Sequence, residues 1–270
     1  MKLSVSTLGC PGLSLYEVLD LTDAAGVDGI EVRGIGGIVD SAKIPCFSAK
    51  EAEATKALLL ERGKTIVGLG TSVQLHDAEH FDAFSKEGLE AIEVAHRMNI
   101  PAIRVFGNDL PDGDGRKEAI DTLLKQYNIL CDAAEDKGIL VNLELHGTVN
   151  TVENIIPVLD GMSRRPSFGI IWDVMHTDRA YGDKWDPVYR LIRPFIRHVH
   201  IKDHERNSTP PFHLMPLGEG DIPLVPIVNR LLEDGYDGYF SFEWEKMWHP
   251  DLAPAEVVFP HFANFMKQFQ

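Results

Sequence analysis

The sequence has few cysteines, no long apolar run and a shortage of basic residues. Its three cysteines, Cys10, Cys46 and Cys131, are an odd, scattered set without Cys-x-x-Cys spacing, which indicates a reducing compartment and no disulfide framework. No run approaches the roughly 20 apolar residues of a membrane span. Residues 1–7 read directly as a strand, with no signal peptide before them. We therefore expect a cytoplasmic protein without a membrane partner.

Positive charge is scarce as well. Lys and Arg together number 26 against 41 for Asp and Glu, which gives a formal net charge of -15. Such a surface repels nucleic acid and anionic membranes, so any phosphate-bearing partner would need a local basic patch. The remaining composition is ordinary for a globular protein, since 44% of the 270 residues are hydrophobic and 25% are charged. We expect a large buried core and no nucleic-acid partner.

Strand-like and helix-like segments alternate along the whole chain. Strands are expected at residues 2–7, 29–33, 65–71, 102–106, 139–145, 168–173, 197–202 and 239–244, and helices at about 14–25, 48–62, 83–98, 116–137, 152–159, 187–191, 224–234 and 255–269. The first two helices begin with capping-box spacing, Ser14 to Glu17 and Ser48 to Glu51. Eight such units without a linker predict an α/β fold, a single (β/α)8 TIM barrel in one domain at 1–270.

Four of the later strands end at a residue that can bind a metal ion. Glu144, Asp173, His200 and Glu243 stand at the ends of strands five to eight, and Glu144 and Asp173 each follow an apolar run. The carboxyl ends of barrel strands meet at one rim, where active sites of this fold lie. Three carboxylates and one imidazole form a hard, oxygen-rich set that suits Mn²⁺, Mg²⁺ or Co²⁺, with Zn²⁺ as a further alternative. We expect one divalent ion, with Mn²⁺ as the first expectation.

Other charged and aromatic residues near the expected rim can each be interpreted as part of the site or as part of the structural framework. His198 shares a strand face with His200 and is interpreted as a packed or supporting histidine. Arg104 is either a substrate clamp or part of a structural ion pair. Glu31 and Arg33 share one face of strand two, and a mutual or cross-strand salt bridge is the favoured interpretation. The tryptophans near the rim could stack on a sugar, although core packing is the default. The long segment 204–221 is either a lid or a subunit contact.

Several motifs resemble those of the xylose isomerase-like superfamily of TIM barrels, the sugar phosphate isomerase/epimerase group. The resemblance covers essentially the whole chain, begins at residues 7–11 and 26–33, and is strongest in Glu-x-His at 144–146, Trp-Asp-x-x-His at 172–176, His-Val-His-Ile-Lys-Asp at 198–203, Gly-Glu-Gly at 218–220 and Phe-Glu-Trp-Glu-Lys at 242–246. It implies a dimer or tetramer and a small sugar or cyclitol as substrate.

The resemblance also implies roles for single residues. The metal ligands would be Glu144, Asp173, His200 and Glu243, and the two glutamates would also transfer protons. Substrate contacts would come from His176 and Arg206, with His146 and Lys202 as further candidates. Ketose 3-epimerases of this group carry a further glutamate six residues after the first ligand, where this chain has Asn150. That difference argues against ketohexose 3-epimerase activity in particular.

The chemistry expected from these residues is isomerisation or epimerisation of a sugar, keto-sugar or cyclitol. A metal ion that bridges a carbonyl and a hydroxyl oxygen stabilises an enediolate, and a carboxylate moves the carbon-bound proton. Loss of a hydroxyl group from the same enediolate would make the enzyme a dehydratase or lyase. A DNA-repair endonuclease of the endonuclease IV type is a remote alternative, because the charge of -15 disfavours DNA. A barrel that binds a polyol without catalysis is the last alternative.

Overall fold

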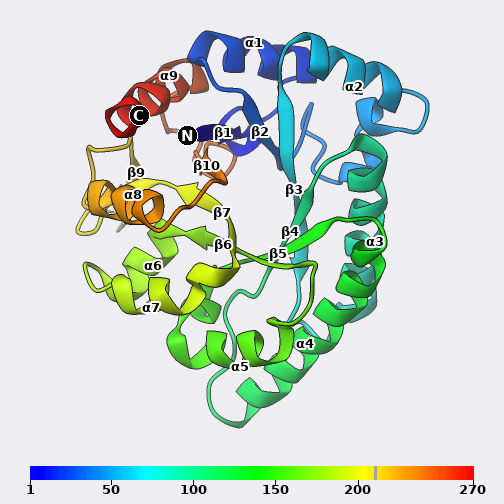
Figure 1. Cartoon of the computed structure of the whole chain (residues 1–270), viewed down its shortest axis with the longest axis vertical. Coiled ribbons are helices and arrows are strands. Elements are labelled where there is room, and N and C mark those ends of the chain that lie inside the picture. The colour runs from blue at the N-terminus through cyan, green and yellow to red at the C-terminus, as the bar shows by residue number, and fades with distance from the viewer. Residues whose placement is uncertain (210–211) are drawn as a thin grey trace.

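Eight parallel strands close into a barrel, in the order β1-β10-β7-β6-β5-β4-β3-β2 (Figure 1). The computed structural model describes residues 1–209 and 212–270. The barrel strands are β1 (Lys2–Ser6), β2 (Gly29–Val32), β3 (Thr65–Gln74), β4 (Ala102–Phe106), β5 (Leu140–Glu144), β6 (Phe168–Asp173), β7 (Ile196–Ile201) and β10 (Tyr239–Phe242). The expected (β/α)8 barrel is therefore confirmed.

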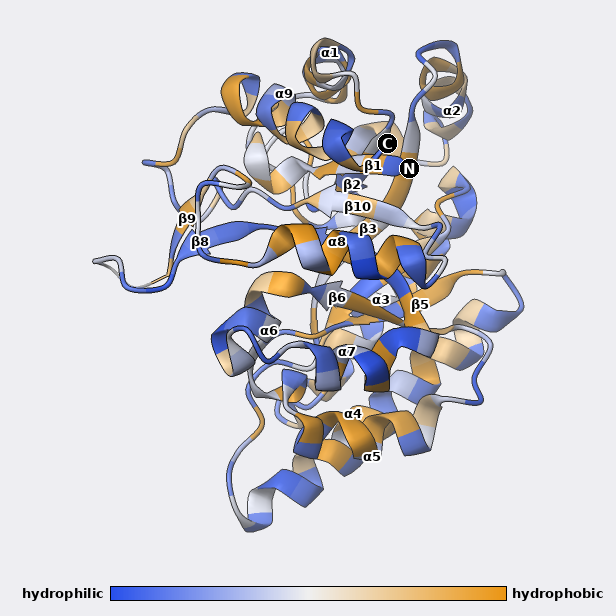
Figure 2. Ribbon diagram, turned by 60° about the vertical axis from the view of Figure 1, so that its left-hand side comes forward, coloured by the Kyte–Doolittle hydropathy of each residue, from blue (hydrophilic) through white to orange (hydrophobic). Residues whose placement is uncertain are grey.

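Helices surround the barrel (Figure 1). They are α1 (Leu15–Ala25), α2 (Ala52–Glu61), α3 (Phe81–Met98), α4 (Asp114–Glu135), α5 (Val152–Met162), α6 (Val174–Tyr181), α7 (Asp186–Ile192), α8 (Leu224–Glu233) and α9 (Ala255–Met266). Within residues 1–209 and 212–270, none of them is both long and apolar enough to span a bilayer. Along α4 and α8, hydrophobic and hydrophilic residues alternate in Figure 2, as expected for helices with one buried and one exposed face.

The strands are buried because helices cover the outside of the barrel and side chains fill its inside. All six residues of β6 are buried, and in β5 only Leu140 is partly exposed. The outer layer is tied to the sheet by Tyr127 of α4, whose hydroxyl donates to the carbonyl of Val141 at 2.6 Å. This rigid frame fixes where the carboxyl ends of β5, β6, β7 and β10 lie.

One of the two expected capping boxes is present. Ser14 Oγ accepts from the amide of Glu17, and Glu17 Oε2 accepts from the amide of Ser14 at 2.7 Å. The second expected box is wrong. Helix α2 begins at Ala52, and the backbone carbonyl of Ser48 accepts the amides of Glu51 and Ala52. The Ser48 side chain is not needed there because backbone hydrogen bonds already close this turn.

The segment at 204–221 was expected to be a loop, but part of it forms a small antiparallel sheet. Strand β8 (Asp203–Glu205) pairs with β9 (His213–Met215), while Pro210 and Pro211 lie outside the described residues. The buried Asp203 carboxylate accepts backbone amides of Gly218 and Gly220 at 2.9 and 3.0 Å. These bonds hold the returning chain against the barrel rim. Its roles as a lid or subunit contact remain hypotheses.

Candidate metal centre

The four expected ligand residues meet at the carboxyl end of the barrel. Glu144, Asp173, His200 and Glu243 each offer one ligand atom, and these atoms all lie within 4.8 Å of one another. All four residues are buried. Strands β5, β6, β7 and β10 are neighbours in the barrel, so these residues form a continuous row with the two glutamates at its ends. The structure therefore brings together the residues that the sequence singled out.

Asp173 also caps a helix, which was not expected from the sequence. Its Oδ1 accepts the backbone amides of Met175 at 2.8 Å and His176 at 3.1 Å, which makes it the N-cap of helix α6. Because Oδ1 is bound this way, Oδ2 faces the cluster. His176 lies in the first turn of this helix, where no helix was expected from the sequence. An aspartate before a helix is a common cap, so the signal was present.

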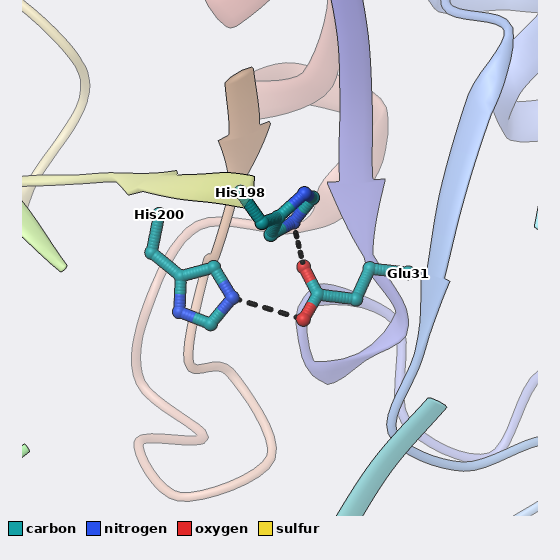
Figure 3. Close-up of side chains that lie close together, drawn as sticks. All are labelled: Glu31, His198 and His200. Atoms are coloured by element: carbon teal, nitrogen blue, oxygen red, sulfur yellow. Dashed lines mark hydrogen bonds and ion pairs between the residues drawn. The ribbon is translucent and has the colours of Figure 1, made fainter. Parts of the chain in front are cut away.

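Glu31 contacts the rings of both His198 and His200, which was not expected from the sequence. Figure 3 shows Nε2 of His198 and Nε2 of His200 directed at different oxygens of Glu31, each at 2.9 Å. Ser241 Oγ also donates to Glu31, at 2.6 Å. A carboxylate that accepts from one ring nitrogen fixes the tautomer that leaves the other nitrogen free for a metal. Of the two expected forms of salt bridge, the mutual one between Glu31 and Arg33 is not formed, and Glu31 instead pairs with histidines of another strand, β7.

The free nitrogen of His200 points into the cluster. Its Nδ1 lies 3.2 Å from Glu243, 3.6 Å from Glu144 and 3.8 Å from Asp173. Burial disfavours a charged imidazole, but the carboxylates of Glu243 and Glu31 outweigh it and hold the pKa of His200 well above its ordinary range. In its charged form the imidazole turns Nδ1 toward three carboxylates, which is where a bound cation would also be held.

Lys202 neutralises the same carboxylates. Its Nζ lies 2.9 Å from Asp173, 2.6 Å from Glu243 and 2.6 Å from Glu245. Burial lowers the pKa of this ammonium group, but the carboxylates, Asp173 foremost, raise it well above its ordinary range. The side chain therefore stays charged at neutral pH and shares two carboxylates with the candidate metal position.

Three potential ligand atoms of the cluster lack a hydrogen bond, and this bears on whether a metal ion suits the site. Glu144 Oε2, Asp173 Oδ2 and His200 Nδ1 are buried and form no hydrogen bond of acceptable geometry within the described residues, although opposite charges lie nearby. Buried ligand atoms without hydrogen bonds are costly unless a cation binds them. Three carboxylate oxygens and one imidazole nitrogen suit a divalent ion. The residues present therefore fit a metal ion.

A cavity of about 140 Å³ opens beside the cluster. Its charged lining residues are Arg33, Arg104, Lys202, Glu144, Glu243 and Glu245, and the others are Leu8, Phe106, His146 and Trp248. Of the three rim tryptophans, Trp172 and Trp244 are buried in the core, whereas Trp248 is 57% exposed and lines the cavity. This cavity is the place where a substrate could reach both glutamates.

The four expected substrate contacts divide into two groups. His146 and Lys202 line the cavity. His176 lies behind His146, with ring centroids 4.0 Å apart, and burial lowers the pKa of His176 to about 3, so its ring is neutral. Arg206 donates instead to Asp178, at 2.9 Å from Nε, and to Asp183, and it is not among the described residues that line the cavity. Its contact with substrate stays a prediction.

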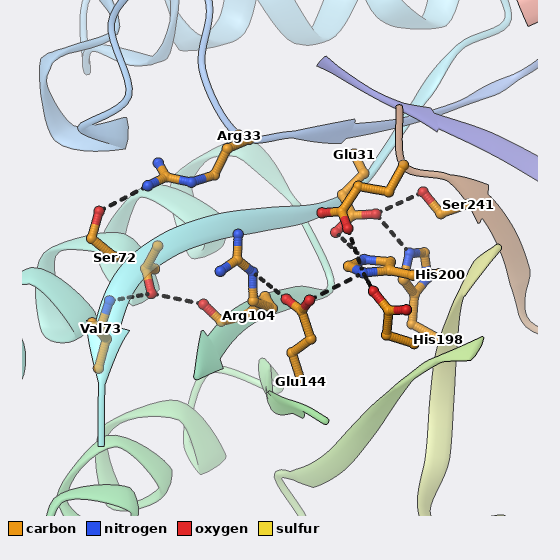
Figure 4. A network of polar contacts seen from close by, with 12 residues as sticks. Glu31, Arg33, Ser72, Val73, Arg104, Glu144, His198, His200 and Ser241 are labelled. Atoms are coloured by element: carbon orange, nitrogen blue, oxygen red, sulfur yellow. Dashed lines mark hydrogen bonds and ion pairs between the residues drawn. The ribbon is translucent and has the colours of Figure 1, made fainter. Parts of the chain in front are cut away.

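Two arginines complete the surroundings of the cluster (Figure 4). Arg104 Nε lies 3.1 Å from Glu144 Oε2, the structural ion pair that was one of its two interpretations. Arg33 donates to Ser72 Oγ at 2.8 Å and to the carbonyl of Val39 at 3.3 Å. The rim of the barrel thus holds a dense group of carboxylates with cations on both sides.

A closed parallel barrel with a buried carboxylate and histidine cluster at its carboxyl rim defines a TIM barrel with a candidate divalent-metal centre. The chain belongs to the xylose isomerase-like TIM barrel family, which it matches over residues 19–268. An uncharacterized protein of Methanocaldococcus jannaschii is 27% identical over 161 residues, which are 57% of this chain. The chain spans about half the length of that relative, 54% of it.

Solved structures share the whole fold at low sequence identity. The probable 3-DHS dehydratase AsbF of Bacillus anthracis has a TM-score of 0.80 and 17% identity, with 99% of both chains covered. The 3-keto-D-glucoside 4-epimerase YcjR of E. coli has a TM-score of 0.77 and 17% identity, again over 99% of both chains. A xylose isomerase-like barrel of Mycobacterium smegmatis in complex with magnesium has a TM-score of 0.75 and 17% identity, covering 99% of this chain and 95% of that one.

Proposed function

We propose that the protein is a divalent-metal-dependent isomerase or epimerase of a keto-sugar or keto-cyclitol. The substrate would bind in the 140 Å³ cavity with its carbonyl and a neighbouring hydroxyl group next to the cluster. Glu144, Asp173, His200 and Glu243 would hold the metal ion. Epimerases among the similar structures, and the magnesium complex, support this class of reaction and this type of cofactor.

One observation supports the proposal most directly. Glu144 and Glu243 are the outermost members of the ligand row, on β5 and just after β10, and both line the cavity. A substrate between them has a carboxylate on either side. One can remove a carbon-bound proton and the other can return a proton from the opposite side, as epimerisation requires. The metal ion would supply the positive charge that stabilises the developing oxyanion.

The surrounding residues would fix the positions of Glu144 and Glu243 and keep Glu243 ionised. Burial opposes ionisation of Glu243, but the positive charges of His200 and Lys202 hold the pKa of its carboxyl well below the usual range. Arg104 holds Glu144 by the contact at 3.1 Å. Both carboxylates are thus fixed in position and Glu243 is ionised before a substrate enters, so little reorganisation is needed.

Asn150 disfavours one member of this class, the ketohexose 3-epimerases. The residue is fully buried, and its Oδ1 accepts from Thr177 Oγ1 at 3.3 Å. It is not among the described residues that line the cavity. A buried amide at this position cannot replace a carboxylate that contacts substrate, so we expect a different keto-sugar or a keto-cyclitol.

The test combines metal analysis with proton exchange. Metal-loaded protein is incubated in D₂O with ketoses, keto-cyclitols and oxidised glycosides, and NMR follows exchange of the carbon-bound proton. Glu144→Gln and Glu243→Gln should each slow the exchange by about 10²- to 10⁴-fold. The exposed Glu219→Gln is the matched control and should exchange at the wild-type rate. Wild-type exchange in both active-site variants, with metal still bound, would disprove the assignment of the two glutamates.

Lys202 favours a dehydratase as the second candidate. Its ammonium group lines the cavity beside Glu243, at 2.6 Å, where it could donate a proton to a departing hydroxyl group. The probable dehydratase among the similar structures is consistent with this chemistry. Mass spectrometry separates the two candidates, because a product lighter by one water indicates dehydration and a product of unchanged mass indicates isomerisation.

A further inference from the structure

Two arginines line the cavity next to the ligand row. Arg33, at the end of β2, and Arg104, on β4, both line it together with Glu144 and Glu243. They are 9% and 4% exposed. The chain as a whole is acidic, with a net charge of -15, so two adjacent buried arginines are a local exception. A charged group this deeply buried needs a partner of opposite charge or a ligand.

Gly70 brings the two arginine side chains together. A Cβ atom at Gly70 of β3 would lie 2.8 Å from Arg33 Cδ and 2.9 Å from Arg104 Nη2. Both side chains therefore pack on the bare backbone of the same residue. Burial, together with the charge of Arg104, lowers the pKa of Arg33 to about 10, as expected for two close cations.

The carboxylates of Glu87, Glu243 and Glu144 act on the charge of Arg33 from a distance, but none of them forms an ion pair with it within the described residues. The two hydrogen-bond acceptors of Arg33, Ser72 Oγ and the carbonyl of Val39, are uncharged, and Arg33 forms no ion pair within residues 1–209 and 212–270. Arg104 has a single carboxylate contact, from Nε to Glu144, while its Nη1 is buried without a hydrogen-bond partner in that same part of the chain. Arg104 lines the cavity and its Nη1 has no acceptor among the described residues, which indicates a missing acceptor.

The guanidinium group of Arg104 is also held in a fixed plane. Its Cζ lies 3.7 Å from the ring centroid of Phe106, which lines the same cavity. A fixed planar fork suits a planar oxyanion, because two parallel N–H groups can donate to two oxygens of one carboxylate. The cavity of about 140 Å³ favours a compact carboxylate over a phosphate.

We propose that Arg33 and Arg104 form a carboxylate subsite, so that the substrate is a keto-sugar acid rather than a neutral sugar. This inference rests on the proposed function, since it places the carbonyl end of the same substrate at the metal cluster and its acid end at the arginines. The subsite adds a requirement that the ligand row alone does not impose: the substrate must be an anion.

The experiment compares three compounds with one carbon skeleton: D-fructose, D-fructuronate and D-fructose 6-phosphate. Binding to Mn²⁺-loaded protein is measured by calorimetry, and bound Mn²⁺ is measured in the same samples. We expect D-fructuronate to bind about 10- to 100-fold more tightly than D-fructose, the gain from charge-assisted hydrogen bonds. Arg33→Met should abolish that preference while Mn²⁺ stays bound, because within the described residues Arg33 forms no hydrogen bond or ion pair with the four ligand residues.

Two further variants control for charge and folding. Arg33→Lys keeps the charge and should retain part of the preference. Arg165→Gln removes an arginine that pairs with Asp132 and Glu135 and does not line the cavity. This variant should retain the full preference for D-fructuronate over D-fructose. Arg104→Met is a supporting variant that should also lower the preference, with metal content measured in parallel because Arg104 contacts Glu144.

The outcomes separate this inference from the proposed function. Equal binding of D-fructuronate and D-fructose, or no binding of D-fructuronate, would overturn the carboxylate subsite. The proposed function would still stand if the protein bound stoichiometric Mn²⁺ and catalysed proton exchange. Tighter binding of the 6-phosphate than of the acid would assign the arginines to a phosphate and equally overturn it. Failure to bind Mn²⁺ would overturn both proposals.

Discussion

Replacing Glu31 by glutamine tests the metal centre most sharply, because Glu31 is not one of the four residues that are proposed to bind the metal but contacts one of them, His200. The carboxylate accepts from Nε2 of His200 and Nε2 of His198, each at 2.9 Å, and from Ser241. Glutamine keeps the shape but removes the negative charge and one acceptor oxygen. The amide NH₂ of the glutamine can then donate to Nε2 of His200, which in the wild type donates to Glu31. This favours the His200 tautomer in which Nδ1 carries the proton and cannot bind a metal.

The expected magnitude follows from the role of such supporting carboxylates. Their loss weakens metal binding by about 10- to 100-fold, or about 1.4 to 2.7 kcal/mol. One effect opposes this loss. Glu31 also raises the pKa of His200, so its removal makes it easier for His200 to lose the proton that competes with the metal ion. That opposing effect shrinks as the pH rises, so the loss of affinity should be largest under alkaline conditions.

The assay is calorimetric titration of metal-free protein with Mn²⁺ at pH values on both sides of neutrality. Ser241→Ala is the matched control, because it removes one hydrogen bond to Glu31 and leaves the charge and both histidine contacts in place. We expect it to change the Mn²⁺ affinity by less than Glu31→Gln does. Wild-type affinity in Glu31→Gln at alkaline pH, or equal losses in the two variants, would refute the orienting role of Glu31.

Three further predictions concern other parts of the molecule. Lys202→Met should bind Mn²⁺ about tenfold more tightly in calorimetry, because it removes a cation that shares Asp173 and Glu243, and unchanged or weaker binding would contradict this. Metal uptake should release a proton from His200, whose pKa is raised, so the affinity should fall as the pH falls, and titrations in buffers of different ionisation enthalpy measure the released proton. Ser14→Ala should lower the free energy of unfolding by about 1 kcal/mol in denaturant titrations by breaking the capping box of α1; an unchanged midpoint would show that the cap adds no stability.

Much of the barrel and of the candidate site could be read from local sequence patterns. The alternation of apolar runs with helical periodicity determined eight strand-and-helix units, and parallel strands in a closed barrel place their carboxyl ends at one rim. Glu144 and Asp173 could be named because each follows an apolar run directly, and His200 and Glu243 because each stands at the end of an expected strand. Their convergence needs no further information once the strands are neighbours in the barrel.

Features that depend on one or two backbone hydrogen bonds were harder to predict. Helix α6 was missed because Asp173 was interpreted only as a metal ligand, although one of its oxygens caps this helix. The capping box at Ser48 was expected but is replaced by backbone bonds to its carbonyl. Capping signals are short, and the tertiary structure decides which of them are used.

Only the tertiary structure decided which charges meet inside the barrel. Glu31 reaches His200, 169 positions away in the sequence, because closure of the barrel leaves only β1 and β10 between β2 and β7. Arg33 and Arg104 come together because Gly70, on the strand between theirs, has no side chain to separate them. The strand pattern alone gives each residue its place on a strand but not its partner across the barrel, since strand stagger and side-chain packing set those contacts. The sequence by itself determined the fold and the four candidate ligands, whereas packing inside the closed barrel decided which residues orient them and where an anion could bind.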